Sequence, residues 1–228
     1  MSTWVVRLWV PDRPGALGAV ASRIGAVRGD VVGIDILERG AGRAIDELVV
    51  ELPDDDLVHL LVQEVQQVDG VDVESIRPLA DALHDPRLDA LETAAMLVGA
   101  SSTEALLDAL CVHGARTVGA EWAVVVDAEA VEILAQFGTV PAVAWLSAFV
   151  AGNRSSAAVA GYDRGPEDVV WAPLPGASLA LVLGRNGTAF RARERRQAAA
   201  LARIVDTRFR ELTAVASRAA HPTGSWRR

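Results

Sequence analysis

Residues 10–17 mark the point where an alternating apolar segment changes to a helical pattern, and this transition limits the possible folds more than any other feature. Apolar residues alternate over 4–10, which is the period of a half-buried strand. They recur at helical spacing over 17–27, with Asp12 predicted as the helix cap and Pro14 in its first turn. A strand that enters a helix through such a turn leaves backbone N–H groups facing one spot, which suits a small carboxylate.

The next segments continue the alternation of strands and helices. Residues 30–38 and 43–52 are rich in strand-forming residues and are joined by a glycine-rich hairpin loop. An apolar stripe over 57–68 predicts a second helix, and alternation over 71–76 predicts another strand. The order strand, helix, strand, strand, helix, strand within 1–78 is that of a ferredoxin-like α+β domain.

The N-terminal segment resembles the ACT domain, a regulatory module that binds amino acids. The resemblance rests on Asp-Arg-Pro-Gly-Ala-Leu at 12–17, which closes the first strand, and on 29–35, which opens the second. In that family the second strand commonly opens with a Gly-Asn-Ile run, and here an Asp occupies the Asn position. Converging N–H groups and two carboxylates able to take an ammonium predict an amino-acid site. The predicted site residues are Asp12, Arg13, Gly15, Ala16, Leu17, Asp30 and Val31.

The rest of the chain is predicted to form a second domain over 87–217, between a proline-bounded linker at 79–86 and a flexible tail at 218–228. Its predicted elements are helices over 88–98 and 101–112, strands over 121–127 and 130–135, a helix over 139–150, a loop over 153–165, strands over 169–174 and 178–183, and a helix over 191–217. The apolar stripe of its first helix consists of Leu88, Leu91, Ala95 and Val98. Ser101 and Ser102, with Glu104, are predicted to cap the second helix.

This second segment resembles a GAF domain. The matching residues are 170–176, 179–184, Phe190 and Glu194, followed by the helix over 198–209. In that family a strand ending in Pro-Leu precedes a turn and a further strand, and a Phe-x-x-x-Glu segment begins the last helix. The resemblance implies an α+β, sensor-type domain built on an antiparallel sheet. The predicted fold class is therefore α+β, a ferredoxin-like βαββαβ domain followed by a GAF-like domain.

Composition argues against several classes of partner. The net charge is −8 and no basic stripe is present, so nucleic-acid binding is not expected. The uncharged stretch 133–153 is long enough to span a membrane, but Gln136, Gly138 and Pro141 interrupt it. A buried strand, a turn and a helix explain that stretch better. The single cysteine, Cys111, excludes an intramolecular disulfide and suits a reducing cytoplasm, which is the expected location.

No residue pattern predicts catalysis, a metal ion or a cofactor. Zinc needs three or four converging N, S or O ligands, whereas the four histidines are far apart in the sequence. Cys111 is predicted to be a buried structural thiol. The acidic run 54–56 is predicted to cap the helix that follows it, and 184–187 to form a hairpin turn. We therefore expect no catalytic, metal-binding or cofactor-binding residues.

Together these patterns predict a cytoplasmic, non-catalytic regulatory protein that binds a small amino acid through its N-terminal domain. Two alternatives stay open: a ligand-free interaction or dimerisation module, and a small-molecule sensor whose ligand binds the GAF-like half. An enzyme with an unrecognised site is a third class. The expected partners are an amino acid, a second copy of the chain, and a metabolic enzyme or regulator. Val5, Arg7 and Trp9 should share the outer sheet face, which a second subunit or the C-terminal half must cover.

Overall fold

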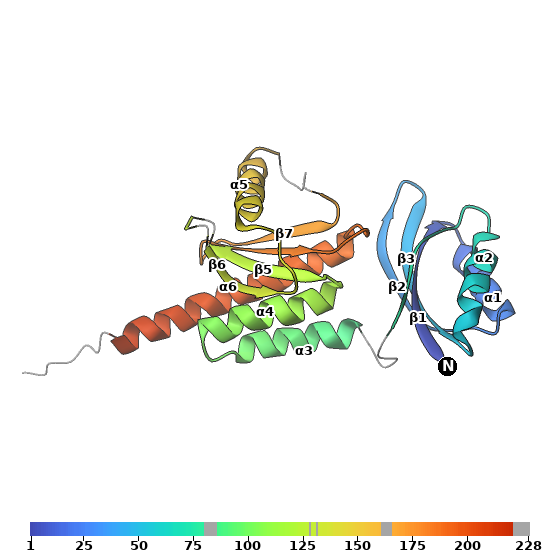
Figure 1. Ribbon diagram of the computed structural model, residues 1–228, viewed down its shortest axis with the longest axis horizontal. Helices are drawn as coiled ribbons and strands as arrows, with labels where there is room; N and C mark the ends of the chain where they lie inside the picture. Colours follow the sequence, from blue (N-terminus) through green and yellow to red (C-terminus); the bar gives the residue numbers. More distant parts are fainter. Residues whose placement is uncertain (80–85, 128, 131, 161–165, 221–228) are drawn as a thin grey trace, which may run out of the picture. The chain divides into compact units, whose positions relative to one another are not determined.

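The computed structural model divides the protein into two compact units. One comprises Met1–His84 with Arg191–Arg193, and the other comprises Asp85–Phe190 with Glu194–Arg228. Each contains a four-stranded antiparallel sheet with helices, so the predicted α+β class is confirmed (Figure 1). The described residues are 1–79, 86–127, 129–130, 132–160 and 166–220.

The first unit has the βαββαβ order that the sequence predicts. Its elements are β1 (Ser2–Pro11), α1 (Ala16–Ala26), β2 (Asp30–Gly40), β3 (Arg43–Leu52), the short helix η1 (Asp55–Leu57), α2 (Val58–Gln66) and β4 (Asp72–Pro78). The strand order is β2-β3-β1-β4, which is the ferredoxin-like split arrangement. Both α-helices lie on one face of this sheet (Figure 1).

Alternation along β1 decides which residues α1 and α2 cover. Val6, Leu8 and Val10 are at most 2% exposed and pack in one core with Val20 and Ile24 of α1. Neighbours opposite one another in adjacent strands share a face, so the inward positions of β3 lie in the same core. The helix-covered face of the sheet, called the inner face below, is therefore set by the period-two pattern of β1 and β3.

The outer face of this sheet carries Val5, Arg7 and Trp9, as the sequence predicts. Val5 and Arg7 are buried, and Trp9 is partly buried. Glu47 stands opposite Arg7, with its carboxylate 3.5 Å from the guanidinium. The guanidinium of Arg43 lies 5.2 Å from the centre of the Trp9 ring. Charged groups on this face are thus held by an ion pair and a cation–π contact.

Two loop predictions in this unit are confirmed. The hairpin loop between β2 and β3 consists of Ala41 and Gly42, whose φ angles are 51° and 77°. A two-residue loop with both residues at positive φ matches the twist of the flanking strands. At the acidic run, the side chain of Asp54 accepts a hydrogen bond from the amide of Asp56 at 3.1 Å and caps η1.

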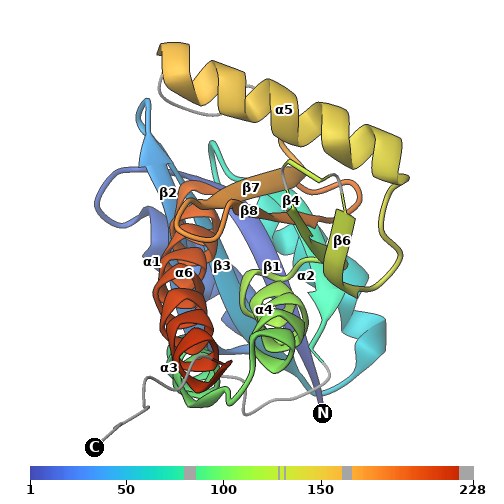
Figure 2. The same ribbon diagram turned by 90° about the vertical axis from the view of Figure 1, so that its left-hand side faces the viewer.

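The second unit places helices on both faces of its sheet. Its elements are α3 (Pro86–Gly99), α4 (Thr103–Val118), β5 (Trp122–Asp127), β6 (Glu132–Phe137), α5 (Val143–Ala160), β7 (Val169–Leu174), β8 (Leu179–Gly184) and α6 (Ala192–Ala220). The strand order is β6-β5-β8-β7. One core lies between the sheet and the helices α4 and α6, and a smaller one lies under α5, which crosses the opposite face (Figure 2).

Two predictions about α4 are confirmed. Ser102 caps the helix, because its hydroxyl accepts a hydrogen bond from the amide of Ala105 at 3.2 Å. Cys111 is a free thiol buried in the main core of this unit. Burial disfavours the thiolate and raises the pKa of Cys111 to about 12. The thiol is therefore neutral at physiological pH and acts as a small apolar side chain.

The orientation of α3 differs from the prediction. Thr93 and Leu97, at 4% and 0% exposed, face the core, whereas Leu91 and Val98 of the predicted apolar stripe are 68% and 58% exposed. α3 packs against α4, and the hydroxyl of Thr93 lies 3.1 Å from that of Thr117. A polar pair therefore occupies the α3–α4 contact, and Leu88 and Leu91 face outward.

α5 is longer than predicted. The sequence predicts a loop over 153–165, but the helix continues to Ala160, and 161–165 lie outside the described residues. Asn153 is accommodated because its side-chain amide donates to the carbonyl of Phe149 at 2.9 Å, within the helix. The uncharged stretch is thus β6, a turn and much of α5, as predicted. None of the helices in the described ranges combines the length and apolar character needed to cross a bilayer.

The predicted linker and tail fall largely outside the described residues, which omit 80–85 and 221–228. The first linker residue, Leu79, donates its amide to the carbonyl of Thr3 at 2.8 Å and so continues the pairing of β4 with β1. α6 continues to Ala220, beyond the predicted start of the tail.

The segment after β8 is not the hairpin turn predicted for 184–187, because α6 and not a strand follows it. Arg185 is only 7% exposed. Its guanidinium donates to both carboxylate oxygens of Glu194, at 2.8 and 2.9 Å. It also donates to the carbonyls of Val118 and Thr188, at 3.1 and 2.9 Å. One side chain thus connects the end of β8, the end of α4 and the start of α6.

We expect Glu194→Gln to destabilise the C-terminal unit, because Arg185 keeps its charge and loses its buried counter-charge. Breaking one partner of a buried pair costs about 3–5 kcal/mol. Chemical denaturation followed by tryptophan fluorescence measures the change. Glu211→Gln is the matched control, since Glu211 pairs with Arg208 at an exposed site of the same helix, and its loss should stay below about 1 kcal/mol. Equal losses in the two variants would contradict the prediction.

Candidate functional site

α1 begins at Ala16, later than the sequence predicts. Gly15, with φ 86°, stands at the N-cap and offers no side chain to cap the helix. The prediction that Asp12 caps the helix, with Pro14 in its first turn, is wrong. Asp12 belongs instead to the end of the hairpin, because its amide donates to the carbonyl of Gly42 at 2.9 Å. The residues between β1 and α1 form a separate turn.

The first turn of α1 presents backbone amides that have no partner among the described residues. These are the amides of Gly15, Leu17 and Gly18, whereas that of Ala16 donates to the carbonyl of Arg13 at 3.3 Å. Gly15 and Gly18 are exposed, and a Cβ at either position would meet no atom within 4 Å. Open amides at the positive end of a helix dipole favour an anion such as a carboxylate.

The structure gathers most of the predicted site residues but separates two of them. Those gathered at the β1–α1 turn are Asp12, Arg13, Gly15, Ala16 and Leu17. Asp30 and Val31 lie at the opposite end of the sheet, because Asp30 pairs with Glu51 whereas Pro11 pairs with Arg43. Residues 43 and 51 of β3 are about 27 Å apart at 3.4 Å per residue. The expected pair of carboxylates, Asp12 with Asp30, is therefore not formed within one chain.

A buried carboxylate that the sequence analysis missed lies on the inner face near this turn. Asp46 is 4% exposed and stands opposite Leu8 in β1 and Ile36 in β2. Its Oδ1 atom is shielded from solvent and has no hydrogen-bond partner. A charged residue at an inward position of the alternating segment 43–52 was the signal that could have identified it.

Burial raises the pKa of Asp46, because the ionised carboxylate loses its hydration. The positive charge of Arg39 lowers this pKa, and the negative charge of Asp12 raises it further. Arg39 also lies 4.0 Å from Asp12, measured from Nε to Oδ1. Asp12, Arg39 and Asp46 therefore interact electrostatically and are called the acidic cluster below; of the three, Asp12 lies in the turn that carries the open amides.

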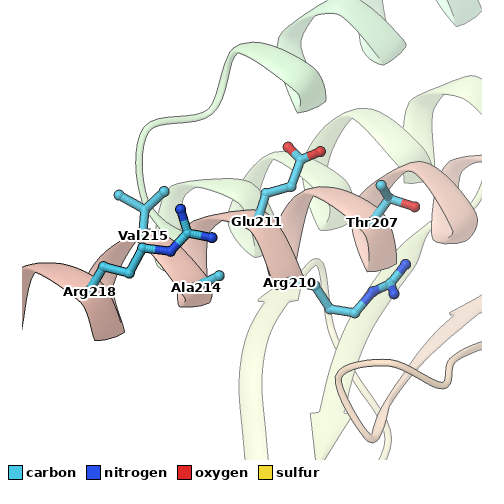
Figure 3. Close-up of a pocket in the computed structure, with 6 residues that line it drawn as sticks. All are labelled: Thr207, Arg210, Glu211, Ala214, Val215 and Arg218. Carbon is cyan, nitrogen blue, oxygen red and sulfur yellow. The ribbon is translucent and has the colours of Figure 1, made fainter.

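A hollow of about 420 Å³ lies along the exposed part of α6 (Figure 3). It is lined by Thr207, Arg210, Glu211, Ala214, Val215 and Arg218. All six residues come from one helix, so the hollow cannot surround a ligand.

A second hollow, of about 280 Å³, lies between α3 and α4. It is lined by Asp89, Glu92, Thr93, Met96, His113, Arg116 and Thr117. His113 and the two carboxylates of this hollow are residue types that acid–base catalysis uses. The hydrogen bonds of Thr117 in the hollow are structural, because its hydroxyl contacts the hydroxyl of Thr93 and the backbone carbonyl of His113. The absence of catalytic residues stays a prediction. Within the described ranges, no group of three or more His, Cys, Asp or Glu is placed to hold a metal ion.

Comparison with known proteins gives likenesses only among solved structures. No protein-family model matches the chain, and no curated protein matches it. The ACT domain of GTP pyrophosphokinase from Chlorobium tepidum is 17% identical and matches 34% of this chain and 97% of its own, with a TM-score of 0.28. An uncharacterised protein from Thermotoga maritima is 24% identical over 34% of this chain and 96% of its own, with a TM-score of 0.28. An unknown protein from Galdieria sulphuraria is 14% identical over 91% of this chain and 93% of its own, with a TM-score of 0.32. At these scores, the fold assignment stands on the strand order and connectivity of the chain itself.

We expect Asp46→Asn to stabilise the N-terminal unit at neutral pH. Because the folded-state pKa of Asp46 is raised, its ionised form costs stability above that pKa and nothing below the ordinary value of 3.8. The gain from the substitution should therefore be complete near pH 7 and disappear as the pH falls toward about 4. Thermal denaturation of both proteins across this range measures it.

The matched control is Asp69→Asn, which removes an exposed carboxylate of the same unit. Arg39 of β2 and Asp12 of the β1–α1 turn are the charged groups that act on Asp46, and its strand neighbours are apolar. A loss of stability in Asp46→Asn at neutral pH would show that the carboxylate is satisfied in the folded protein.

Proposed function

We propose that the N-terminal unit is a regulatory module that binds a small amino acid at the start of α1. The observation that supports this proposal is that the amides of Gly15, Leu17 and Gly18 have no hydrogen-bond acceptor among the described residues. The space beside Gly15 and Gly18 is also open, because a Cβ at either position would meet no atom within 4 Å. These amides suit the carboxylate of an amino acid, and the net negative charge of the acidic cluster suits its ammonium group.

The connectivity of the unit supports the regulatory role. Its strand order and the loop sequence at 12–17 are those that a resemblance to the ACT domain implies. We place this module in a non-catalytic protein whose target is a metabolic enzyme or regulator. A ligand-free interaction module is the alternative that a binding screen separates from it.

A second copy of this chain is the partner that we propose for β2. β2 is an edge strand, and it exposes Val32, Ile34 and Ile36 at 48%, 44% and 42%. An edge strand with exposed apolar side chains offers both unpaired backbone groups and a surface that gains from burial. A homodimer joined along β2 would cover both.

One observation favours a second candidate function, a GAF-like sensor in the C-terminal unit. Trp145 of α5 lies 6.5 Å from Trp122 and 5.0 Å from Phe149, measured between ring centres. Trp171 packs against the same core, and its indole Nε1 is shielded from solvent without a hydrogen-bond partner. A small molecule with a carbonyl oxygen could satisfy this donor within an aromatic layer.

We expect Ile34→Lys to convert a dimer into a monomer, because it places a charge in the middle of the proposed β2 interface. Sedimentation of the full chain over a range of concentrations measures the change. Val215→Lys is the control, since it adds the same charge at a residue of α6 that is 64% exposed. A wild-type chain that sediments as a monomer, or a dimer that Ile34→Lys leaves intact, rules out this interface.

The binding site is tested by Gly18→Val, which covers the open amides without requiring a positive φ. Thermal shift with the standard L-amino acids should reveal a stabilising ligand, worth about 2.7 kcal/mol at 100 times its dissociation constant. Gly18→Val should weaken that binding by about tenfold or more. Gly25→Val adds the same side chain to the other end of α1, also in open space, and should bind normally.

Two results of this screen would count against the site. If Gly18→Val binds like the wild type, the ligand lies elsewhere. If no amino acid stabilises the wild type, the ligand-free module or the C-terminal sensor replaces the proposal.

A further inference from the structure

We propose that Asp46 is the amine-binding residue of this site, so that the module selects molecules with a protonated amine beside a carboxylate and rejects carboxylic acids that lack the amine. This inference rests on the proposed amino-acid binding and names the residue that makes it selective. It also replaces Asp30, which the sequence predicts as the second carboxylate but which lies at the far end of the sheet.

The strand register places Asp46 near the start of α1. Pro11, the last residue of β1, pairs with Arg43, and Asp46 follows three positions later on β3. Its partner Leu8 lies in the core under α1 and α2, so Asp46 occupies the same inner face. The negative charge of Asp12 also raises the pKa of Asp46.

Burial and hydrogen bonding make Asp46 different from the other carboxylates of this unit. It is the most buried of them among the described residues, at 4% exposed, and its Oδ1 has no hydrogen-bond partner. A buried carboxylate oxygen without a donor carries most of its desolvation penalty uncompensated. An ammonium group supplies both the missing donors and the missing charge, and a neutral group supplies at most the donors.

The charges of the acidic cluster point to a single cation. Asp12 and Asp46 contribute two negative charges, and Arg39 contributes one positive charge. Arg39 is largely exposed, lies 4.0 Å from Asp12 and also acts on Asp46, so one positive charge is shared between two carboxylates. One ammonium balances the cluster, while the amides of Gly15, Leu17 and Gly18 remain available for a carboxylate. An α-amino acid carries both groups on a single carbon atom.

The test uses the full chain, with isothermal titration of the amino acid that stabilises the wild type in the thermal-shift screen of the standard L-amino acids. Asp46→Asn keeps the shape of the side chain and removes its charge, and it should weaken binding by about 10- to 100-fold. Asp69→Asn is the matched control and should bind like the wild type. The amine-free acids propionate, isovalerate and 3-phenylpropionate, compared with alanine, valine and phenylalanine, should not bind the wild type measurably.

The pH dependence separates a binding role from a structural one. Wild-type affinity should fall as the pH drops through the raised pKa of Asp46, because the protonated side chain no longer attracts an ammonium. Asp46→Asn should lack this component of the pH dependence, whereas Asp12→Asn, which removes the other carboxylate of the acidic cluster, should retain it.

Three outcomes would overturn the inference. Equal affinity of Asp46→Asn and wild type for the same amino acid removes Asp46 from the site but leaves the proposed function intact. Equal binding of an amino acid and its amine-free acid removes the selectivity. A wild type that no amino acid stabilises removes the proposed function, and this inference with it.

Discussion

The cover that α1 and α2 place over one face of the N-terminal sheet determines the rest of this unit. Most inward side chains of β1 and β3 lose contact with water, so apolar residues are favoured at those positions and polar ones carry a large cost. The same cover brings the start of α1 to the end of the sheet where β1 finishes and β3 begins. The open amides at the start of α1 therefore follow the end of β1, and the buried carboxylate of Asp46 lies three residues along β3 from the partner of Pro11.

Much of the fold could be predicted from periodicity, because alternation and helical spacing report burial directly. The strand order of the N-terminal unit, the Ala41–Gly42 loop and the Ser102 cap all follow from local patterns. The misses occurred where a contact distant in sequence decided the outcome. The amide of Asp12 pairs with the hairpin carbonyl of Gly42, and α1 begins only at Ala16. In α3, Thr93 meets Thr117, and Leu91 faces outward. Arg185 was predicted to lie in a hairpin turn, because its ion pair with Glu194, nine residues later, forms only when the chain is folded.

The candidate site was predictable in part for the same reason. The open amides follow from a strand, a glycine-containing turn and a helix, all of which are local in sequence. The pairing of Asp12 with Asp30 depended on the direction of β2, and antiparallel pairing with β3 carries Asp30 to the far end of the sheet. Asp46 was recoverable, because residues that flank it at even spacing, Ala44 and Leu48, mark its position as inward. A charged residue at an inward position of an otherwise apolar alternation indicates a buried carboxylate.

An unpaired carboxylate on the inner face has a consequence for how such a module responds to its ligand. A ligand that supplies an ammonium would compensate the desolvation cost of Asp46, and this compensation would add to its affinity and so to the stability of the folded unit. Ile36, the cross-strand neighbour of Asp46, belongs to the exposed part of β2 that we propose as the dimer edge. Ligand and second copy would therefore act on adjacent positions of one strand pair. Coupling between two binding events is reciprocal, so whatever dimerisation does to ligand affinity, the ligand must do to dimerisation by the same factor. A shared strand pair is the physical element through which amino-acid binding in this unit would be transmitted to its assembly.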